Sequence, residues 1–351
     1  MWKPSEFRDL VSGRQRGLRA TLLRGVLAAA ETPYRWAVQL RNAAFDGGLR
    51  RVTRVQVPVV SVGNLSLGGT GKTPMVEWLA NWFCQHGVHV VLISRGYRAG
   101  AGTLNDEALE LAKRLPHVPH LQDPHRVRAA QQAIRDYACG LILLDDAFQH
   151  RRIARDLDIV LLDALEPFGW SHVFPRGTLR EPLTGLARAQ VVALSRSDAV
   201  DAATRESIRR KVAQLAPDAV WLELVHQPLT LVAADGRQAP LDTLAGRKVA
   251  AFCGVGNPAG FRLTVQACGY QLTDFREFPD HFAFADRDVA ALEQWTAGLS
   301  DISGVVCTNK DLAKINRLRL GPHPLWAVGI GVEIRHGRDG LEARLRALLP
   351  G

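Results

Sequence analysis

Apolar runs alternate with helix-spaced segments along most of the chain. Runs rich in Val, Ile and Leu occur at residues 55–62, 89–94, 140–144, 157–163 and 190–195. Apolar residues recur at the three- and four-residue spacing of amphipathic helices in segments 74–83, 106–115 and 124–137. Near-continuous apolar strands separated by helices are typical of a parallel sheet that is covered on both faces. The pattern therefore predicts an α/β fold.

The second half of the chain contains two extended stretches without helical spacing, at 221–232 and 325–334. Between them lies a self-contained α/β segment with strands expected at 248–253 and 304–308. We predict a smaller α/β domain joined to the first by a two-stranded linker. The predicted parts are an N-terminal segment at 1–54, a main domain at 55–220, linker strands at 221–232 and 325–334, the smaller domain at 233–324, and a C-terminal helix that returns to the main domain at 335–351.

The first 54 residues have a different pattern. Apolar residues from Leu18 to Ala30 share one helical face, arginines occupy the remainder, and Pro33 interrupts the pattern. Aromatic and apolar residues resume over 34–45. A basic amphipathic helix with aromatics suits a membrane interface, and the alternative is a helix packed on its own domain with a solvated arginine face.

Charge is concentrated in this segment. The 351-residue chain has a formal net charge of +9, and residues 1–54 hold 11 Lys and Arg against 4 Asp and Glu. A positive segment suggests an acidic partner, and a nearly neutral remainder argues against a general nucleic-acid groove. We expect contact with a membrane surface, no nucleic acid and no obligate protein partner.

Other compositional signals favour a cytoplasmic protein. The 5 cysteines are scattered without a CxxC pair or metal-ligand spacing, as expected for buried thiols in a reducing compartment. The start lacks the pattern of a cleavable signal, and no run of about 18 uncharged apolar residues is present.

A glycine-rich loop follows the first apolar run directly and precedes a helical segment. It comprises Ser66, Leu67, Gly68, Gly69, Thr70, Gly71, Lys72 and Thr73. Strand, glycine-rich turn and helix form a phosphate-binding loop, in which backbone N–H groups and the helix N-terminus cradle phosphates. Lys72 would reach the β- and γ-phosphates and the Thr73 hydroxyl would bind Mg²⁺. The loop predicts binding of a nucleoside triphosphate.

Carboxylates and cations follow other strands at the same predicted sheet edge. Asp145 and Asp146 end an apolar run and are candidate Mg²⁺ ligands. Gln149 and His150 follow them, and Arg95 ends another strand. Ligands of open parallel sheets bind outside the carboxyl ends of the strands, so we interpret this edge as functional.

Three further positions have both a structural and a catalytic interpretation. Asp106 opens a helix, where it is either an N-cap or the carboxylate that a kinase uses to deprotonate an acceptor hydroxyl. Arg180 lies in a loop rich in Pro and Gly and suits bidentate phosphate contact. His281 follows Asp280 in a loop, which is either a surface turn or part of a catalytic site.

The motifs VPVVSVGNLSLGGTGKTP, LISRGYR, NDEALELAKR, LLDDAFQHRRIARDLDIVLLD, FPRGTLREPL, FPDHFAF and TNKDLAK occur in this order between Val57 and Lys314. Together they resemble the tetraacyldisaccharide 4'-kinase family. The resemblance implies transfer of the ATP γ-phosphate to the 4'-hydroxyl of a tetraacyldisaccharide 1-phosphate, which yields lipid IVA in lipid A biosynthesis. It also implies Mg²⁺, an N-terminal helix that docks on the membrane, and a location at the cytoplasmic face of the inner membrane of a Gram-negative bacterium.

The resemblance also assigns roles by position. Asp106 matches the acid that accepts the acceptor proton, and His281 matches a histidine that forms a dyad with it. Lys72 belongs to the phosphate loop and acts on the transferred group. The metal side comprises Thr73, Asp145, Asp146 and Glu107, and the substrate side comprises Arg95, Gln149, His150 and Arg180.

One alternative remains from another class. Membrane-associated switch ATPases of the deviant phosphate-loop type share the GGTGKT core. Their signature places a Lys directly before the two glycines, where this chain has Leu67. The sequence therefore favours a lipid kinase.

Overall fold

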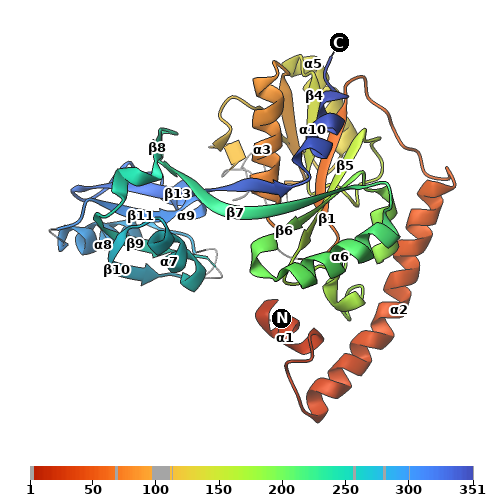
Figure 1. Ribbon diagram of the computed structural model, residues 1–351, viewed down its shortest axis with the longest axis horizontal. Coiled ribbons are helices and arrows are strands. Elements are labelled where there is room, and N and C mark those ends of the chain that lie inside the picture. The colour runs from red at the N-terminus through yellow and green to blue at the C-terminus, as the bar shows by residue number, and fades with distance from the viewer. Residues whose placement is uncertain are drawn as a thin grey trace. The chain divides into compact units, whose positions relative to one another are not determined.

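The computed structural model describes residues 4–67, 70–96, 111–112, 114–255, 258–279, 282–299 and 301–350. The chain divides into two compact units. The first comprises Met1–Arg95, Leu121–Val225 and Glu333–Gly351, and the second comprises Gly96–His120 and His226–Val332. Most helices and strands of both units are labelled in Figure 1.

The first unit contains a mainly parallel sheet. Its strand order is β7-β6-β5-β1-β4-β2-β3. The bounds are β1 Val59–Asn64, β2 Val90–Ser94, β3 His120–Gln122, β4 Leu141–Asp145, β5 Leu157–Asp163, β6 Val191–Ser195 and β7 Val220–Val232. The pairs from β2 through β4, β1, β5 and β6 to β7 are all parallel. Strands β1, β2, β4 and β6 are buried along their whole length, as expected for central strands covered on both faces.

Helices cover the two faces of this sheet. They are α3 Lys72–Gln85, α5 Arg126–Tyr137, α6 Ala202–Leu215 and α10 Arg338–Arg346. Ala129, Ala130 and Ala133 of α5 pack in one core cluster with residues of β1, β2 and β4. Ile208 and Val212 of α6 pack in another with residues of β5 and β6. The small side chains of α5 let its backbone pack closely on these three strands.

The second unit is also α/β. Its strands are β8 Gln238–Pro240, β9 Lys248–Cys253, β10 Gln271–Glu277, β11 Gly304–Thr308, β12 Arg319–Leu320 and β13 His323–His336. Its described helices of more than one turn are α7 Pro258–Ala267, α8 Asp286–Ala297 and α9 Asn309–Ile315. Strands β10, β9, β11 and β13 are neighbours in this order and pair in parallel. The expected strands at 248–253 and 304–308 have these bounds in the structure.

Two long strands, β7 and β13, each run along the chain from one unit into the other. The predicted fold class is therefore confirmed: a parallel α/β unit is joined by two strands to a second α/β unit.

The N-terminal segment forms helix α1, Pro4–Val11, and helix α2, Leu18–Asp46. Helix α2 continues through Pro33, so the predicted interruption at this residue is wrong. A proline inside a helix costs one backbone hydrogen bond and some strain. Burial of Glu31 and Val38 on either side of it holds both halves of the helix against the first unit. Among the described residues, no helix is long and apolar enough to cross a membrane.

Helix α2 has two contrasting faces. Ala20, Glu31, Val38 and Phe45 are buried on the inner face. The opposite face presents large apolar side chains that are 65–84% exposed, namely Leu18, Leu22, Val26, Trp36 and Leu40. All residues from 18 to 43 are described, and among the exposed ones Arg19 is the one charged residue. The helix both packs on its own unit and offers an apolar outer face.

Candidate active site

The phosphate-binding loop joins β1 to α3. Gly71 has φ of 76°, a left-handed conformation that glycine adopts without strain, and it is the N-cap of α3. Lys72 is the first residue of α3, so the loop ends at the positive end of a helix dipole. Gly68 and Gly69 lie outside the described residues. The described part of the loop has the strand–turn–helix context that the sequence predicts.

The segment around Arg180 supports this loop from one side. The Leu67 N–H donates to the Thr178 carbonyl at 2.7 Å, and the Arg180 N–H donates to the Leu65 carbonyl at 2.7 Å. Ser66 and Leu179 form an antiparallel bridge between these bonds. The first part of the phosphate loop is thus paired with a second loop that carries Arg180.

The two predicted carboxylates lie at the sheet edge where this loop begins. In the parallel register of β1 and β4, Asp145 is opposite Val62, two residues before β1 ends. Lys72 Nζ lies 3.5 Å from Asp146 Oδ1, and Arg180 Nη1 donates to both Asp146 oxygens at 2.9 Å. Burial favours a raised pKa for Asp146, but the charges of Lys72 and Arg180 outweigh it and the pKa lies below its usual value. Asp146 is therefore ionised at neutral pH.

These residues fit a magnesium ion held together with a nucleotide. The described residues contain no group of three or more His, Cys, Asp or Glu that would hold a metal alone. Magnesium in nucleotide sites uses one or two protein oxygens and takes the rest from phosphates and water. Thr73, Asp145 and Asp146 supply a hydroxyl and carboxylates of this kind, and Glu107 lies outside the described residues.

Gln149 and His150 follow in the loop after β4. Gln149 Nε2 donates to the Asn64 carbonyl at 2.8 Å and to Glu181 Oε1 at 3.1 Å. His150 Nε2 is buried and has no hydrogen-bond partner among the residues that the structure describes. Burial, and after it the nearby charges of Arg126 and Arg152, lower the pKa of His150 to about 4. The imidazole is therefore neutral at pH 7 and sits in a strongly positive environment.

His150 lines a pocket of about 390 Å³ in the first unit. The other lining residues are Arg50, Arg51, Thr53, His125, Arg126, Val127 and Arg152. These described lining residues include four arginines and no carboxylate. The Arg126 side chain is almost completely buried, and one of its nitrogens donates to the Asp123 carbonyl at 2.7 Å. A fixed, desolvated guanidinium such as that of Arg126 binds anions well, and the exposed Arg50, Arg51 and Arg152 add positive charge, so the pocket is suited to a phosphate. We define it as the basic pocket.

Replacing His150 with Gln should reduce the loss of stability in acid. The unfolded chain takes up a proton on His150 near pH 6.5, while the folded protein does so only near its lowered pKa of about 4. The unfolded state therefore binds more protons between these values, and stability falls as pH decreases from about 6.5 toward 4. Between pH 7 and 4.5 the free energy of unfolding should fall by about 1–2 kcal/mol more in wild type than in His150→Gln, allowing for partial solvent screening. Urea unfolding at both pH values checks this, and His125→Gln is the matched control from the same pocket.

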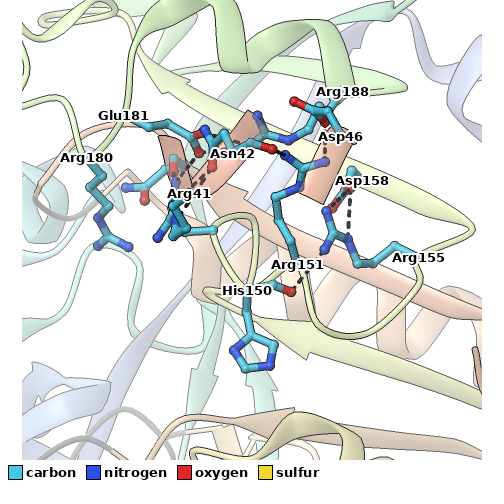
Figure 2. Close-up of polar contacts among 12 residues, drawn as sticks. Arg41, Asn42, Asp46, His150, Arg151, Arg155, Asp158, Arg180, Glu181 and Arg188 are labelled. Atoms are coloured by element: carbon cyan, nitrogen blue, oxygen red, sulfur yellow. Dashed lines mark hydrogen bonds and ion pairs between the residues drawn. The ribbon is translucent and has the colours of Figure 1, made fainter. Parts of the chain in front are cut away.

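The structure thus brings several predicted residues together and leaves others untested. Lys72 and Arg180 both contact Asp146, and Gln149, from the same loop as Asp146, donates to Asn64 and Glu181 (Figure 2 shows Glu181, Arg180 and His150). Arg95 is exposed at the end of β2, and its positive charge contributes to the lowered pKa of His150. Asp106, Glu107 and His281 lie outside the described residues, so their pairing stays a prediction.

The sequence alone did not indicate Arg50, Arg51, Arg126 or Glu181 as site residues, whereas Arg152 belongs to the polar and cationic stretch that follows Asp146 at the predicted functional edge. A signal was present, because Arg-Arg pairs occur at 50–51 and 151–152, the second directly after His150. The link between them is not local, since only the fold brings Arg50, Arg51 and Arg126 to one pocket with Arg152.

Comparison with known proteins gives concordant results. The family model for tetraacyldisaccharide-1-P 4'-kinase matches residues 23–350. A tetraacyldisaccharide 4'-kinase from Anaeromyxobacter sp. (strain K) is 39% identical over 342 residues, covering 92% of this chain and 90% of that protein. The corresponding protein from Syntrophus aciditrophicus is 36% identical and covers 80% of this chain and 82% of its own length. The crystal structure of LpxK from Aquifex aeolicus in complex with ATP superimposes with a TM-score of 0.76 at 27% identity, covering 93% of this chain and 100% of that chain.

Proposed function

The chain belongs to the tetraacyldisaccharide-1-P 4'-kinase family, and from this premise we propose that it transfers the γ-phosphate of ATP to the 4'-hydroxyl of a tetraacyldisaccharide 1-phosphate. The product would be lipid IVA, an intermediate of lipid A biosynthesis. The observation that carries this proposal is the phosphate-binding loop whose Lys72 meets Asp146 and, through it, Arg180. This arrangement suits stabilisation of a transferring phosphoryl group.

The residues of the first unit divide the work of phosphoryl transfer. Loop amides and the α3 N-terminus would bind the β- and γ-phosphates, and Lys72 would neutralise charge that develops on the transferred group. Thr73, Asp145 and Asp146 would hold Mg²⁺, which, when bound, neutralises charge on the phosphate oxygens. Arg180 keeps Asp146 ionised and oriented, because both of its carboxylate oxygens accept from the guanidinium. Arg95 would add positive charge at the same sheet edge.

The basic pocket would take the phosphate that the acceptor already carries. The acceptor class has a 1-phosphate, and the pocket offers four arginines without a competing carboxylate among its described lining residues. His150 lies in this pocket, and Gln149 directly precedes it in the loop after β4 that also carries Asp146. Binding the 1-phosphate there would orient the disaccharide toward the nucleotide. This gives Gln149 and His150 their proposed roles in substrate binding.

Asp106 and His281 would supply proton transfer. In this hypothesis Asp106 orients and deprotonates the 4'-hydroxyl, and His281 assists it. Glu107 is proposed to act on the metal side.

Replacing Asp106 with Ala should lower kcat by about two to three orders of magnitude, because general base catalysis typically contributes that much. Steady-state kinetics with saturating ATP would measure the change. Glu110→Ala, in the same motif, is a matched carboxylate control. Unimpaired transfer in Asp106→Ala would remove Asp106 from the mechanism.

The outer face of helix α2 is proposed to dock on the cytoplasmic face of the inner membrane. The apolar side chains from Leu18 to Leu40 would enter the interface, and Arg16, Arg19, Arg50 and Arg51 flank the two ends of the helix, near where anionic head groups would lie. Such docking would bring the enzyme to a lipid acceptor that remains in the bilayer.

The test of the reaction is transfer from γ-labelled ATP to purified tetraacyldisaccharide 1-phosphate in detergent with Mg²⁺. We expect a labelled bisphosphorylated lipid. Hydrolysis of ATP without labelled lipid would contradict the proposal and favour the switch ATPase of the deviant phosphate-loop type. Omitting Mg²⁺ and adding a chelator should abolish transfer.

A further inference from the structure

A completely buried carboxylate connects helix α2 with the loops of the nucleotide site. Glu181 has no exposed surface, and three side chains from different segments donate to it. Asn42 Nδ2 of helix α2 lies 2.9 Å from Oε2, Gln149 Nε2 lies 3.1 Å from Oε1, and Arg188 Nη2 lies 2.9 Å from both oxygens. Figure 2 labels Glu181 together with its partners Asn42 and Arg188.

The surroundings of Glu181 are shaped for a charged carboxylate. A carboxylate without exposure is costly unless its oxygens are paired, and Arg188 supplies the opposite charge. Arg188 is itself fixed, because its guanidinium lies 4.5 Å from the centre of the Phe148 ring. A side chain at Gly185 would place its Cβ 2.8 Å from Glu181 Oε2, so this glycine leaves room for the carboxylate. The carboxylate and its charged partner Arg188 are therefore both held in place.

Two routes lead from Glu181 to groups that act on the nucleotide, one through its partner Gln149 and one through its chain neighbour Arg180. Gln149 also donates to the carbonyl of Asn64, whose side chain donates to Thr70 of the phosphate loop at 3.2 Å. Arg180 precedes Glu181 directly and holds Asp146. Displacing Glu181 would therefore shift both the phosphate loop and the loop after β4 that carries Asp146.

We propose that Glu181 is a positioning residue that couples Asn42 of helix α2 to Gln149 and the nucleotide loops. Helix α2 is the helix that carries the apolar outer face. The Glu181 carboxylate connects this helix to the side of the phosphate loop. The inference deepens the proposed function and rests on it only in that this loop binds ATP. A change in how helix α2 is held is transmitted to nucleotide binding without any contact between the helix and the nucleotide.

The test is a double-mutant cycle on nucleotide binding. A fluorescent ATP analogue with Mg²⁺ is titrated into wild type, Asn42→Ala, Gln149→Ala and the double variant, all without lipid. We expect each single variant to bind the ATP analogue about three- to tenfold more weakly than wild type. The double variant should bind no more weakly than the more affected single variant, because the effects of substitutions at groups joined through one contact network are not additive. Gln39→Ala, at an exposed position of the same helix, is the matched control and should bind like wild type. Thermal unfolding of every variant checks that each is folded.

Three outcomes would overturn the proposal. These are unchanged binding in Asn42→Ala, effects that multiply in the double variant, or an equal loss in Gln39→Ala. Because the readout needs no acceptor, failure of lipid phosphorylation would count against the proposed reaction and leave this coupling intact.

Discussion

Replacing Lys72 with Ala is expected to lower the rate of phosphoryl transfer by on the order of a thousandfold. Lys72 begins helix α3, and its ammonium group lies 3.5 Å from Asp146. In that position it can neutralise charge on the transferring group at no cost of reorganisation. Alanine removes this charge and leaves the loop amides in place, so nucleotide binding should weaken much less than kcat falls.

Labelled-phosphate transfer under saturating ATP measures the effect, and titration of a fluorescent ATP analogue separates binding from chemistry. Lys211→Ala is the matched control, since Lys211 lies on α6 in the same unit and contacts the Phe168 ring. Arg180→Ala should have a smaller effect, because Lys72 still holds Asp146 ionised. A Lys72→Ala variant within tenfold of wild type would contradict the assignment of this loop to catalysis.

The parts of the site that follow from short stretches of sequence could be predicted. The phosphate loop depends on a strand, a few glycines and the next helix, all between Val59 and Gln85, and the described part of the loop has that structure. The position of Asp145 and Asp146 at the same sheet edge follows from a general rule, since parallel strands place their carboxyl ends at one edge, and β1 and β4 pair in this way. Their role as Mg²⁺ ligands stays a prediction.

The parts that depend on distant pairing could not be predicted. Glu31 lies in the middle of helix α2, where a carboxylate is usually solvated. In the structure it is buried and contacts Arg35, His172 and Arg176, two of which are more than 140 residues away. Burial favours a raised pKa for Glu31, but Arg35 and the other positive groups outweigh it, and its pKa is lowered. These distant partners lie on the same side of the helix as the buried Ala20, Val38 and Phe45, and together they hold this face inward.

The sequence left two interpretations of helix α2 open, a helix packed on its own domain and a helix at a membrane interface. Apolar spacing alone fits a packed helix and a membrane helix equally well. The structure shows a packed inner face and an exposed apolar outer face on one helix. A soluble protein rarely leaves several large apolar side chains on one stripe without a partner surface, which favours docking of the outer face.

Replacing four apolar residues of the outer face with Gln is expected to weaken binding to anionic vesicles by roughly a thousandfold. The residues are Leu22, Val26, Trp36 and Leu40. Burying a large apolar side chain fully contributes about 1.5–3 kcal/mol, and insertion at an interface removes only part of its surface from water. About 1 kcal/mol for each residue gives about 4 kcal/mol, which corresponds to roughly three decades in the partition coefficient.

Vesicle co-sedimentation measures this partition. The matched control places Gln at four exposed positions of helix α6, namely Ala203, Glu206, Ser207 and Arg210. Both variants should unfold near the wild-type temperature, because none of the eight side chains is buried. The α2 variant should still bind the fluorescent ATP analogue, since Asn42 and Glu181 are unchanged, and should lose turnover mainly on acceptor presented in vesicles. If the α2 variant partitions like wild type, the outer face of α2 is not the membrane contact, and the basic residues that flank the helix must account for any vesicle binding on their own.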